Sequence, residues 1–226
     1  MKYLISILFV CLTISIISRP AIGSEDKIID ILRKAEKAYS QIGNYCAVLV
    51  KKERINDKYI LEEILLKFKK PFKVYLKWIG KNHKGREIIF DKDKNNGNML
   101  VREGSFLHFL THSLNPKSDM AMDGQRHSID EIGIGNLITK ISMEVNKAAQ
   151  NNDIELSFSE DNNHYALYGH FLNDEYYSKK FHLFVNKDNY MIKRAVFYDS
   201  KGIFEDYTFD QLELNQNFSE KDFRFY

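Results

Sequence analysis

The sequence predicts an α+β protein built around one large antiparallel sheet. Two amphipathic helical segments each precede a series of strand-like segments, which gives the order helix, strands, helix, strands. The strand-like segments are short, alternate apolar with polar residues and are joined by turn-rich loops, as is typical of antiparallel sheets. The sequence contains neither the G-x-G-x-x-G fingerprint nor a P-loop, which argues against a nucleotide-binding α/β fold.

Residues 1–23 have the layout of a secretory signal peptide. A lysine follows the initiator methionine, an apolar run comes next, and "AIG" supplies the small residues expected before a cleavage site. The apolar run is shorter than the ~20 residues that a membrane span needs, so a membrane-anchored form is the less favoured alternative. Residues 24–226 are then expected to form a single domain in the periplasm.

Charge and cysteine content restrict the functional class. The chain has a formal net charge of +2, and Lys2 and Arg19 would leave with the signal peptide. The remaining domain would carry no net charge, so no nucleic-acid partner is predicted. Cys46 would be its only cysteine, which excludes an internal disulfide, and its apolar surroundings predict a buried structural thiol.

The first part of the domain is expected to be a helix followed by a hairpin. Residues 25–42 carry apolar residues at three- and four-residue spacing, with Ser24 as a candidate cap and Gly43 as a natural end. Two strand-like segments, 45–55 and 59–70, then flank the dipeptide "ND", which is typical of a hairpin turn.

Further strands are expected on both sides of a second helix. Pro71 ends the second strand, and residues 72–80 alternate cleanly between apolar and polar. The next strand-like segments are "REIIFD", "NMLVREG" and "SFLHFLTH". After the second helix, at residues 129–147, come "DIELSFS", "HYALYGHF", "KKFHLFVN", "MIKRAVFYD" and "FEDYTFDQLEL".

The segment before the second helix, "DGQRHSIDEIGIGNL", is rich in residues that could form a catalytic or metal site. Ser128 and Glu131 match a capping box for the helix. Arg126 and His127 are expected to anchor the loop to the sheet or to the helix start. Their role is therefore predicted to be structural.

Neither a metal, another cofactor nor a catalytic residue is predicted in this segment. A metal site needs at least three converging ligands, and a loop and a cap are expected to separate Asp123, His127 and Glu131. Adjacent residues such as His127 and Ser128 rarely point at each other as a nucleophile and its base do. A hydrolase that uses the His127 loop remains a third option, and it requires those three residues to converge in a cleft.

Five segments together resemble one known family. They are "YCAVLVKKERI", "LKFKKPFKVYLKW", "GKNHKGREIIF", "MDGQRHSIDEIGIGNLI" and "FEDYTFDQLELNQNFSEKDF". In this order they resemble the bacterial domain-of-unknown-function family 1571, over about residues 27–223. That family is grouped with the LolA-like proteins, which are periplasmic carriers and sensors of lipoproteins and lipids.

The resemblance implies a particular form of the α+β fold. We expect a strongly curved, incompletely closed antiparallel β-sheet, a LolA-like half-barrel, with helices on its concave face. An apolar cavity between helices and sheet would accept acyl chains. The resemblance carries over no catalytic residue and assigns no role to Arg54, Arg86 or Arg126.

The alternating strands supply candidates for the two faces of the sheet. A helix laid on the apolar face makes an ordinary core if packing is tight and a ligand cavity if packing is loose. The candidates for the cavity wall are Ile64, Leu66, Phe68, Val74, Leu76 and Trp78. The opposite faces are expected to carry Lys67, Lys69, Lys73 and Lys77, together with Lys51. These lysines would attract anionic head groups or a partner, or would form a solvated face that discourages edge pairing.

These observations predict an exported, non-enzymatic binding protein for a lipid, a lipoprotein acyl chain or another hydrophobic ligand. The alternative is an envelope sensor or protein-interaction module of the same fold without a bound lipid. Its expected partners are a hydrophobic ligand or lipoprotein, and a membrane surface or envelope protein.

Overall fold

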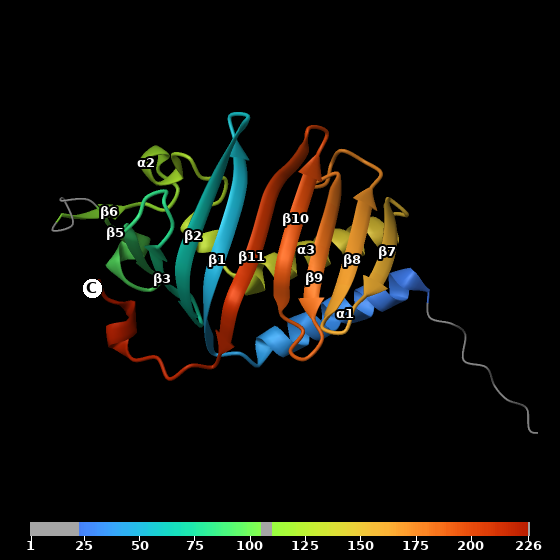
Figure 1. Cartoon of the computed structure of the whole chain (residues 1–226), viewed down its shortest axis with the longest axis horizontal. Helices are drawn as coiled ribbons and strands as arrows, with labels where there is room; N and C mark the ends of the chain where they lie inside the picture. The colour runs from blue at the N-terminus through green and yellow to red at the C-terminus, as the bar shows by residue number, and fades with distance from the viewer. Residues whose placement is uncertain (1–22, 105–109, 226) are drawn as a thin grey trace, which may run out of the picture.

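The computed structural model describes residues 23–104 and 110–225 of the chain. The predicted signal peptide, apart from Gly23, lies outside the described residues, as does most of the strand predicted at "SFLHFLTH". The described part is one sheet with helices against one of its faces (Figure 1). None of its helices is both long and apolar enough to cross a membrane.

Within the described residues, eleven strands form an antiparallel sheet in the order β6-β5-β4-β3-β2-β1-β11-β10-β9-β8-β7. The strands are β1 (Asn44–Ile55), β2 (Lys58–Lys69), β3 (Lys73–Trp78), β4 (Glu87–Asp91), β5 (Met99–Arg102), β6 (Thr111–Leu114), β7 (Ile154–Glu160), β8 (His164–Phe171), β9 (Lys180–Asn186), β10 (Ile192–Asp199) and β11 (Gly202–Leu214). The helices are α1 (Ser24–Ser40), α2 (Asp119–Met122) and α3 (Ile134–Gln150), with 3₁₀ turns η1 (Asn95–Gly97), η2 (Ile129–Glu131) and η3 (Glu220–Phe223).

The sheet consists of two meanders that meet at its centre. The chain starts in the middle with β1 and moves outward to β6 at one edge. It then crosses to β7 at the other edge and returns strand by strand until β11 pairs with β1. The crossing segment contains α3, which passes behind the strands (Figure 1).

The fold prediction is confirmed. The sheet is antiparallel and strongly curved, its edges β6 and β7 do not pair with each other, and the helices lie on its concave face (Figure 1). Curvature is the natural result of the right-handed twist, because about 20–25° of rotation between neighbours accumulates over many strands.

Helices α1 and α3 close one half of the concave face. They pack against each other and against β7. Their inward residues are fully buried together with residues of β8, β9 and β10. These residues are Ile28, Ile31, Leu32, Ile134, Ile138, Ile141, Val145, Leu167, Leu183 and Ala195. This is the tightly packed part of the core.

The "ND" hairpin forms as predicted. Asn56 and Asp57 adopt φ values of 48° and 61° between β1 and β2. Two successive residues with positive φ are the mark of a type I′ turn, which matches the twist of the flanking strands. The turn fixes the register in which Leu49 lies opposite Ile64 and Leu66 opposite Ala47.

The start of the second helix differs from the prediction. A separate 3₁₀ turn, η2, occupies its expected first residues, and α3 begins only at Ile134. The predicted capping box does not form, because the Ser128 hydroxyl donates to the nearby Asp130 carboxylate. Gly133 has a φ of 115°, which interrupts the helix there.

The helix start is instead held by a residue from β1. The hydroxyl oxygen of Tyr45 accepts a hydrogen bond from the backbone N–H of Ile134, at 2.9 Å. A Cβ atom on Gly133 would lie 2.8 Å from that hydroxyl, so only glycine lets the chain approach so closely. This contact sets where α3 begins to cover the sheet.

Candidate functional site

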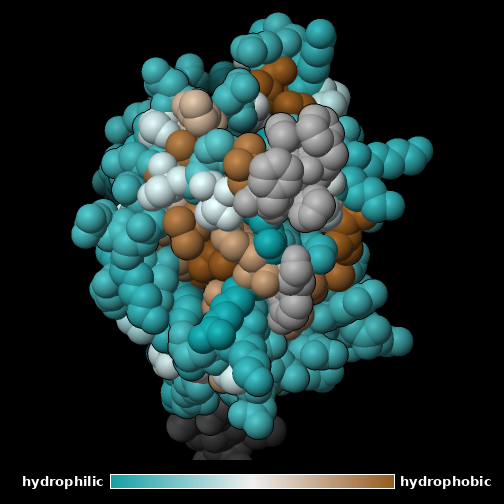
Figure 2. All heavy atoms as spheres, turned by 90° about the vertical axis from the view of Figure 1, so that its left-hand side faces the viewer, coloured by the Kyte–Doolittle hydropathy of each residue, from teal (hydrophilic) through white to brown (hydrophobic). Residues whose placement is uncertain are grey.

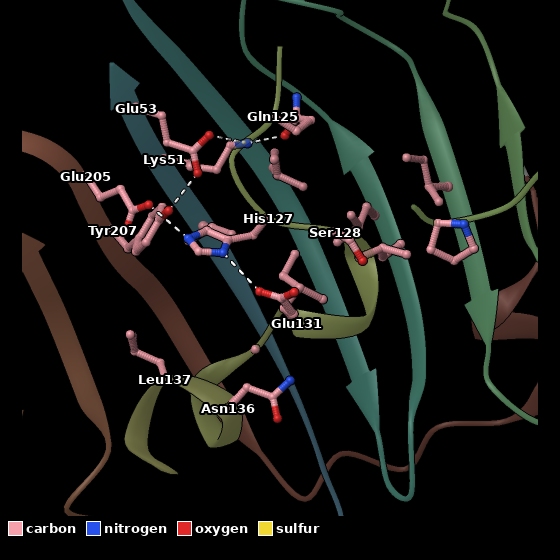
Figure 3. A pocket seen from close by; sticks show the side chains of 18 of the residues that line it. Lys51, Glu53, Gln125, His127, Ser128, Glu131, Asn136, Leu137, Glu205 and Tyr207 are labelled. Atoms are coloured by element: carbon pink, nitrogen blue, oxygen red, sulfur yellow. Dashed lines mark hydrogen bonds and ion pairs between the residues drawn. The ribbon is translucent and has the colours of Figure 1, made fainter. Parts of the chain in front are cut away.

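A cavity of about 580 Å³ lies between the sheet and the segment that leads into α3. Its walls come from the central strands, from α2, from the first half of α3 and from residues 123–133, which we call the strap (Figure 3). The strap contains η2 and runs across the concave face where no long helix covers it. The cavity therefore occupies the half of the sheet that α1 leaves open.

One wall of the cavity is apolar. Successive inward positions of neighbouring strands supply it, because residues two apart share a face and paired strands align them. Ile64 of β2 pairs with Trp78 of β3, and Leu76 pairs with Ile88 of β4. The apolar lining residues from the strands are Leu49, Ile64, Leu76, Trp78, Ile88, Met99, Phe197 and Phe209. The strap and α3 add Ile129, Ile132 and Leu137.

Two methionines stand at the edge of the cavity. Met120 of α2 and Met143 of α3 both line it, yet they are 72% and 68% exposed. Figure 2 looks at the end of the molecule that carries α2, and apolar side chains gather there inside a hydrophilic rim. Flexible methionines at such a rim are suited to contact with varied apolar surfaces.

The opposite side of the cavity is polar and is built around Glu205 of β11. This side chain is almost fully buried and accepts hydrogen bonds from three groups. Arg126 donates from Nε at 3.0 Å, His127 from Nε2 at 2.8 Å, and Tyr177 from its hydroxyl. Burial alone would raise the pKa of Glu205, but its bonds with His127, Tyr177 and Arg126 outweigh burial and lower it.

His127 lies between two carboxylates. Its Nδ1 is 3.0 Å from Glu131 and its Nε2 is 2.8 Å from Glu205 (Figure 3). Burial alone would lower the pKa of the imidazole, but the Glu205 carboxylate outweighs burial and raises it. The charged form, with a proton on each nitrogen, fits this position best because each nitrogen then donates to an anion.

The strap is fastened to the sheet at two further points. The side-chain oxygen of Gln125 accepts a hydrogen bond from the ammonium of Lys51 on β1. The guanidinium of Arg126 also reaches the backbone oxygen of Arg54, at 3.2 Å. Successive residues of the strap thus bind β1 and β11, the two central strands.

A second cluster of polar side chains lies on β1 and β2, next to the residues that bind the strap. The Lys51 ammonium is 2.7 Å from Glu62, whose other oxygen accepts the Trp78 indole N–H at 2.7 Å. Burial alone would raise the pKa of Glu62, and the Lys51 charge reverses this and lowers it. Tyr207 donates to Glu53 at 2.6 Å, which joins this group to β11.

The predicted cavity residues divide into two sets. All six are buried, but only Ile64, Leu76 and Trp78 line the cavity. Phe68 stacks on Tyr45 with ring centroids 5.2 Å apart and belongs, with Leu66 and Val74, to the packed core.

The predicted lysine face is partly covered by the chain's own C-terminal segment. Lys67 pairs with Asp222 at 3.1 Å, and Lys73 pairs with Glu220 at 2.6 Å, so η3 brings two carboxylates onto this face. The hydrogen bond from Lys73 is the main cause of the lowered pKa of Glu220, and the Lys69 charge adds to it. Lys77 pairs with Glu87 of β4 at 3.4 Å.

Lys51 was grouped with these outer lysines, and that assignment is wrong. The burial pattern of β1 places Lys51 on the inner face together with Leu49 and Glu53. The strand continues its alternation past the last apolar residue, so inward positions near its end are charged.

The three arginines left without a role differ in position. Arg54 pairs with Asp199 across the sheet, and Arg86 pairs with Glu103 at 3.0 Å and lines the cavity. Arg126 fastens the strap to Glu205.

The residues named for a hydrolase all border the cavity, where the His127 imidazole is hydrogen-bonded to the Glu131 and Glu205 carboxylates. Asp123, His127 and Glu131 are lining residues, and the Ser128 hydroxyl is taken up by Asp130. Among the described residues, no group of three or more His, Cys, Asp or Glu side chains could hold a metal ion.

Sequence reasoning missed the residues outside the strap that form the polar wall or, as Glu62 does, bind a residue of it. They are Glu53, Glu62, Lys140, Tyr177, Glu205 and Tyr207. The available signal was a charge at an inward position of an otherwise apolar alternation, as Glu62 is two residues before Ile64 and Glu205 is four before Phe209.

Comparison with solved structures returns proteins of low sequence identity. An uncharacterized conserved protein from Thermus thermophilus has 13% identity, with 88% of this chain and 94% of that chain covered, at a TM-score of 0.48. The Mycobacterium tuberculosis lipoprotein LppX has 10% identity, with 85% and 97% covered, at 0.48. A LolA superfamily protein from Nitrosomonas europaea has 13% identity, with 86% and 96% covered, at 0.36.

Comparison with protein families is more direct. The search of curated proteins found no match. The sequence model of one family, described as protein of unknown function (DUF1571), matches residues 42–226, which include every strand of the sheet and the whole strap. The chain belongs to this family.

Proposed function

We propose that this protein is an exported, non-enzymatic binding protein that holds a lipid, a lipoprotein acyl chain or another hydrophobic ligand between the sheet and the strap. The observation that carries the proposal is the cavity itself. Its volume of about 580 Å³ lies within the roughly 300–1,000 Å³ typical of small-molecule sites.

The composition of the cavity supports the same proposal. An apolar wall with polar groups confined to one side is the arrangement that favours an amphipathic or apolar ligand. Leu76, Ile88 and Met99 would each gain contacts with a chain that fills the space, because atoms that face an empty space have no partner atoms on that side. The exposed Met120 and Met143 would be covered at the same time.

The state of His127 favours binding over hydrolysis. A general base needs a free lone pair, whereas both nitrogens of this imidazole face carboxylates and its raised pKa favours the charged form. The Ser128 hydroxyl is bound to Asp130 and would have to leave it to act as a nucleophile.

The single tryptophan of the sequence makes the proposal directly testable. Trp78 lines the cavity, so its fluorescence reports what enters. The mature protein, residues 24–226, is titrated with ω-bromoundecanol and ω-bromoundecanoate below their micelle concentrations, because a bromine beside the indole quenches its emission. We expect saturable quenching by at least one probe and its reversal by the unbrominated compound.

A matched pair of variants assigns the quenching to the cavity. Ala121 of α2 lines the cavity and Ala149 of α3 does not, although both are half-buried. Ala121→Phe should weaken probe binding severalfold and Ala149→Phe should leave it unchanged. If neither probe quenches Trp78 in the wild-type protein, the binding proposal fails and the protein-interaction alternative takes its place.

Recovery of the natural ligand provides a second test. The protein is purified from a bacterial periplasm without detergent and analysed by native mass spectrometry, followed by solvent extraction. A bound lipid at one copy per chain is expected, together with an N-terminus near residue 24. A bound lipid that the protein converts to a new product over hours, and that His127→Ala leaves intact, would instead establish the hydrolase.

A further inference from the structure

The face that α3 turns toward the cavity carries a single charged residue. Asn136, Leu137, Thr139, Lys140 and Met143 are the lining residues of this helix, and Lys140 alone among them is ionisable. Asn136, Lys140 and Met143 are spaced by four and three residues, which places them on one side of a helix. Figure 3 shows Asn136 and Leu137 from the first turns of α3 beside the strap.

Among the described residues that line the cavity, Lys140 differs from the cations Lys51, Arg86 and His127 because it has no carboxylate at ion-pair distance. Lys51 is paired with Glu62 at 2.7 Å, Arg86 with Glu103 at 3.0 Å and His127 with Glu205 at 2.8 Å. Within the described part of the chain, no carboxylate oxygen lies within 4.0 Å of the Lys140 ammonium. Its close contact is the Tyr177 ring, whose centroid is 3.2 Å from Nζ.

The surroundings of Lys140 leave its charge incompletely balanced. The side chain is half-buried, and this burial lowers the pKa of its ammonium, although more distant carboxylates act in the opposite direction. Those carboxylates are engaged elsewhere, since Glu205 and Glu131 bind His127 and Glu144 accepts the backbone N–H of Tyr177. A half-buried cation without a counter-ion is costly, and an anion supplied by a ligand would remove that cost.

We propose that the ligand of the cavity is an amphiphile with an anionic head group, a carboxylate or a phosphate, and that the Lys140 ammonium pairs with this head. The proposal rests on the proposed function, because it concerns the same cavity. The head lies at the polar side, beside α3 and the Tyr177 ring, and the chain extends along Leu76 and Ile88. Asn136 and Thr139, which line the same side, supply neutral hydrogen-bonding groups to the head.

A series of probes with one chain and four heads tests this assignment. ω-Bromoundecanoate, ω-bromoundecyl phosphate, ω-bromoundecanol and ω-bromoundecyltrimethylammonium present the same bromine to Trp78 but differ in charge. Wild-type protein should bind both anionic probes at least about tenfold more tightly than the alcohol, because a charge-assisted pair adds that much in a partly dry site. The cationic probe should bind more weakly than the alcohol.

Three substitutions locate the effect at Lys140. Lys140→Met keeps an unbranched stem and should bring the anionic probes to the affinity of the alcohol, while the affinity of the alcohol itself stays the same. Lys140→Arg should restore most of the preference. Lys147→Met is the matched control, because Lys147 lies on the same helix over the Tyr176 ring but outside the cavity lining. Melting temperatures of all variants show that each is folded.

The outcomes separate the two proposals. If the alcohol and the anionic probes bind equally and Lys140→Met changes none of them, the head-group assignment is overturned and the apolar site stands. If no probe quenches Trp78, the proposed function itself has failed. Inorganic phosphate is added as a competitor of the phosphate probe. If its affinity equals that of the probe, the site is one for small anions, and the amphiphile assignment is overturned.

Discussion

The two halves of one sheet are covered in different ways. Strands β7–β10 are covered by α1 and α3, and the inward residues of β8, β9 and β10 are fully buried in a continuous apolar core. Strands β2–β5 present a similar apolar alternation but are covered by the strap, which leaves a cavity of about 580 Å³. The comparison teaches that alternation decides which residues face inward, whereas the length of the covering element decides whether they meet a core or a space.

The largest difference between the halves should appear in stability. Ile138→Ala in α3 removes a fully buried side chain and should cost about 2–5 kcal/mol of unfolding free energy. Leu76→Ala in the cavity wall should fall at or below the lower end of that range, because part of its surface already meets no protein atoms. Urea denaturation of both variants measures this, and equal losses would contradict the distinction between the two halves.

Substitutions that release the strap should have the next largest effect on stability. Glu205→Gln keeps the shape of the side chain but removes the charge that Arg126 and His127 share, and it should cost about 1–3 kcal/mol. Proteolysis within the strap should accelerate in this variant while hydrogen exchange in α3 stays slow. Glu160→Gln, at an exposed site on β7, is the matched control. It should change neither the stability of the protein nor the rate of proteolysis within the strap.

The ion pair between His127 and Glu205 predicts how the stability of the protein depends on pH. Because the folded-state pKa of His127 is raised, its contribution is complete below the unfolded value near 6.5 and is lost as pH rises through the folded value. The pKa of Glu205 is lowered, so its contribution is present above its unfolded value and is lost as pH falls through the folded one. The unfolding free energies of wild type and His127→Gln should therefore differ most between the unfolded-state pKa values of Glu205 and His127. The two free energies should converge at alkaline pH.

The outer lysines should have the smallest effect. Lys73→Ala breaks a pair with Glu220 near the surface, and such pairs contribute about 0–1 kcal/mol. Binding of the bromoundecyl probes should be unchanged, because Lys73 lies on the opposite face from the cavity. A loss of probe binding in this variant would mean that ligand contacts extend beyond the concave side.

The sequence was sufficient to predict the architecture, but of the site it predicted residues of the apolar wall and missed most of the polar wall. The alternation in residues 72–80 identifies Leu76 and Trp78 as inward, and their pairing with Ile88 and Ile64 follows from short connections. That alternation also marks Val74, and the alternation of β2 marks Phe68, but both residues meet the core instead. What separates the two sets is where α3 begins, and that depends on a contact between Tyr45 and residue 134 that leaves no local signal.

The strap illustrates the same limit. Its polar residues were expected to anchor a loop, and Arg126 and His127 do bind the sheet. Their acceptor, Glu205, lies nearly eighty residues further along the chain, so no spacing rule connects them. The capping pair expected between Ser128 and Glu131 was a local pattern. It does not form, because the Ser128 hydroxyl donates to Asp130 instead.

The position of β1 has a consequence for the order of folding. The strand that completes the middle of the sheet, β11, is the last one synthesised, and it joins residues 44–55 to residues 202–214. The edge of the first meander at β1 therefore lacks this partner until β11 has been synthesised, and pairing across such a sequence separation is intrinsically slow. The middle of the sheet can therefore close only after residues 202–214 have left the ribosome.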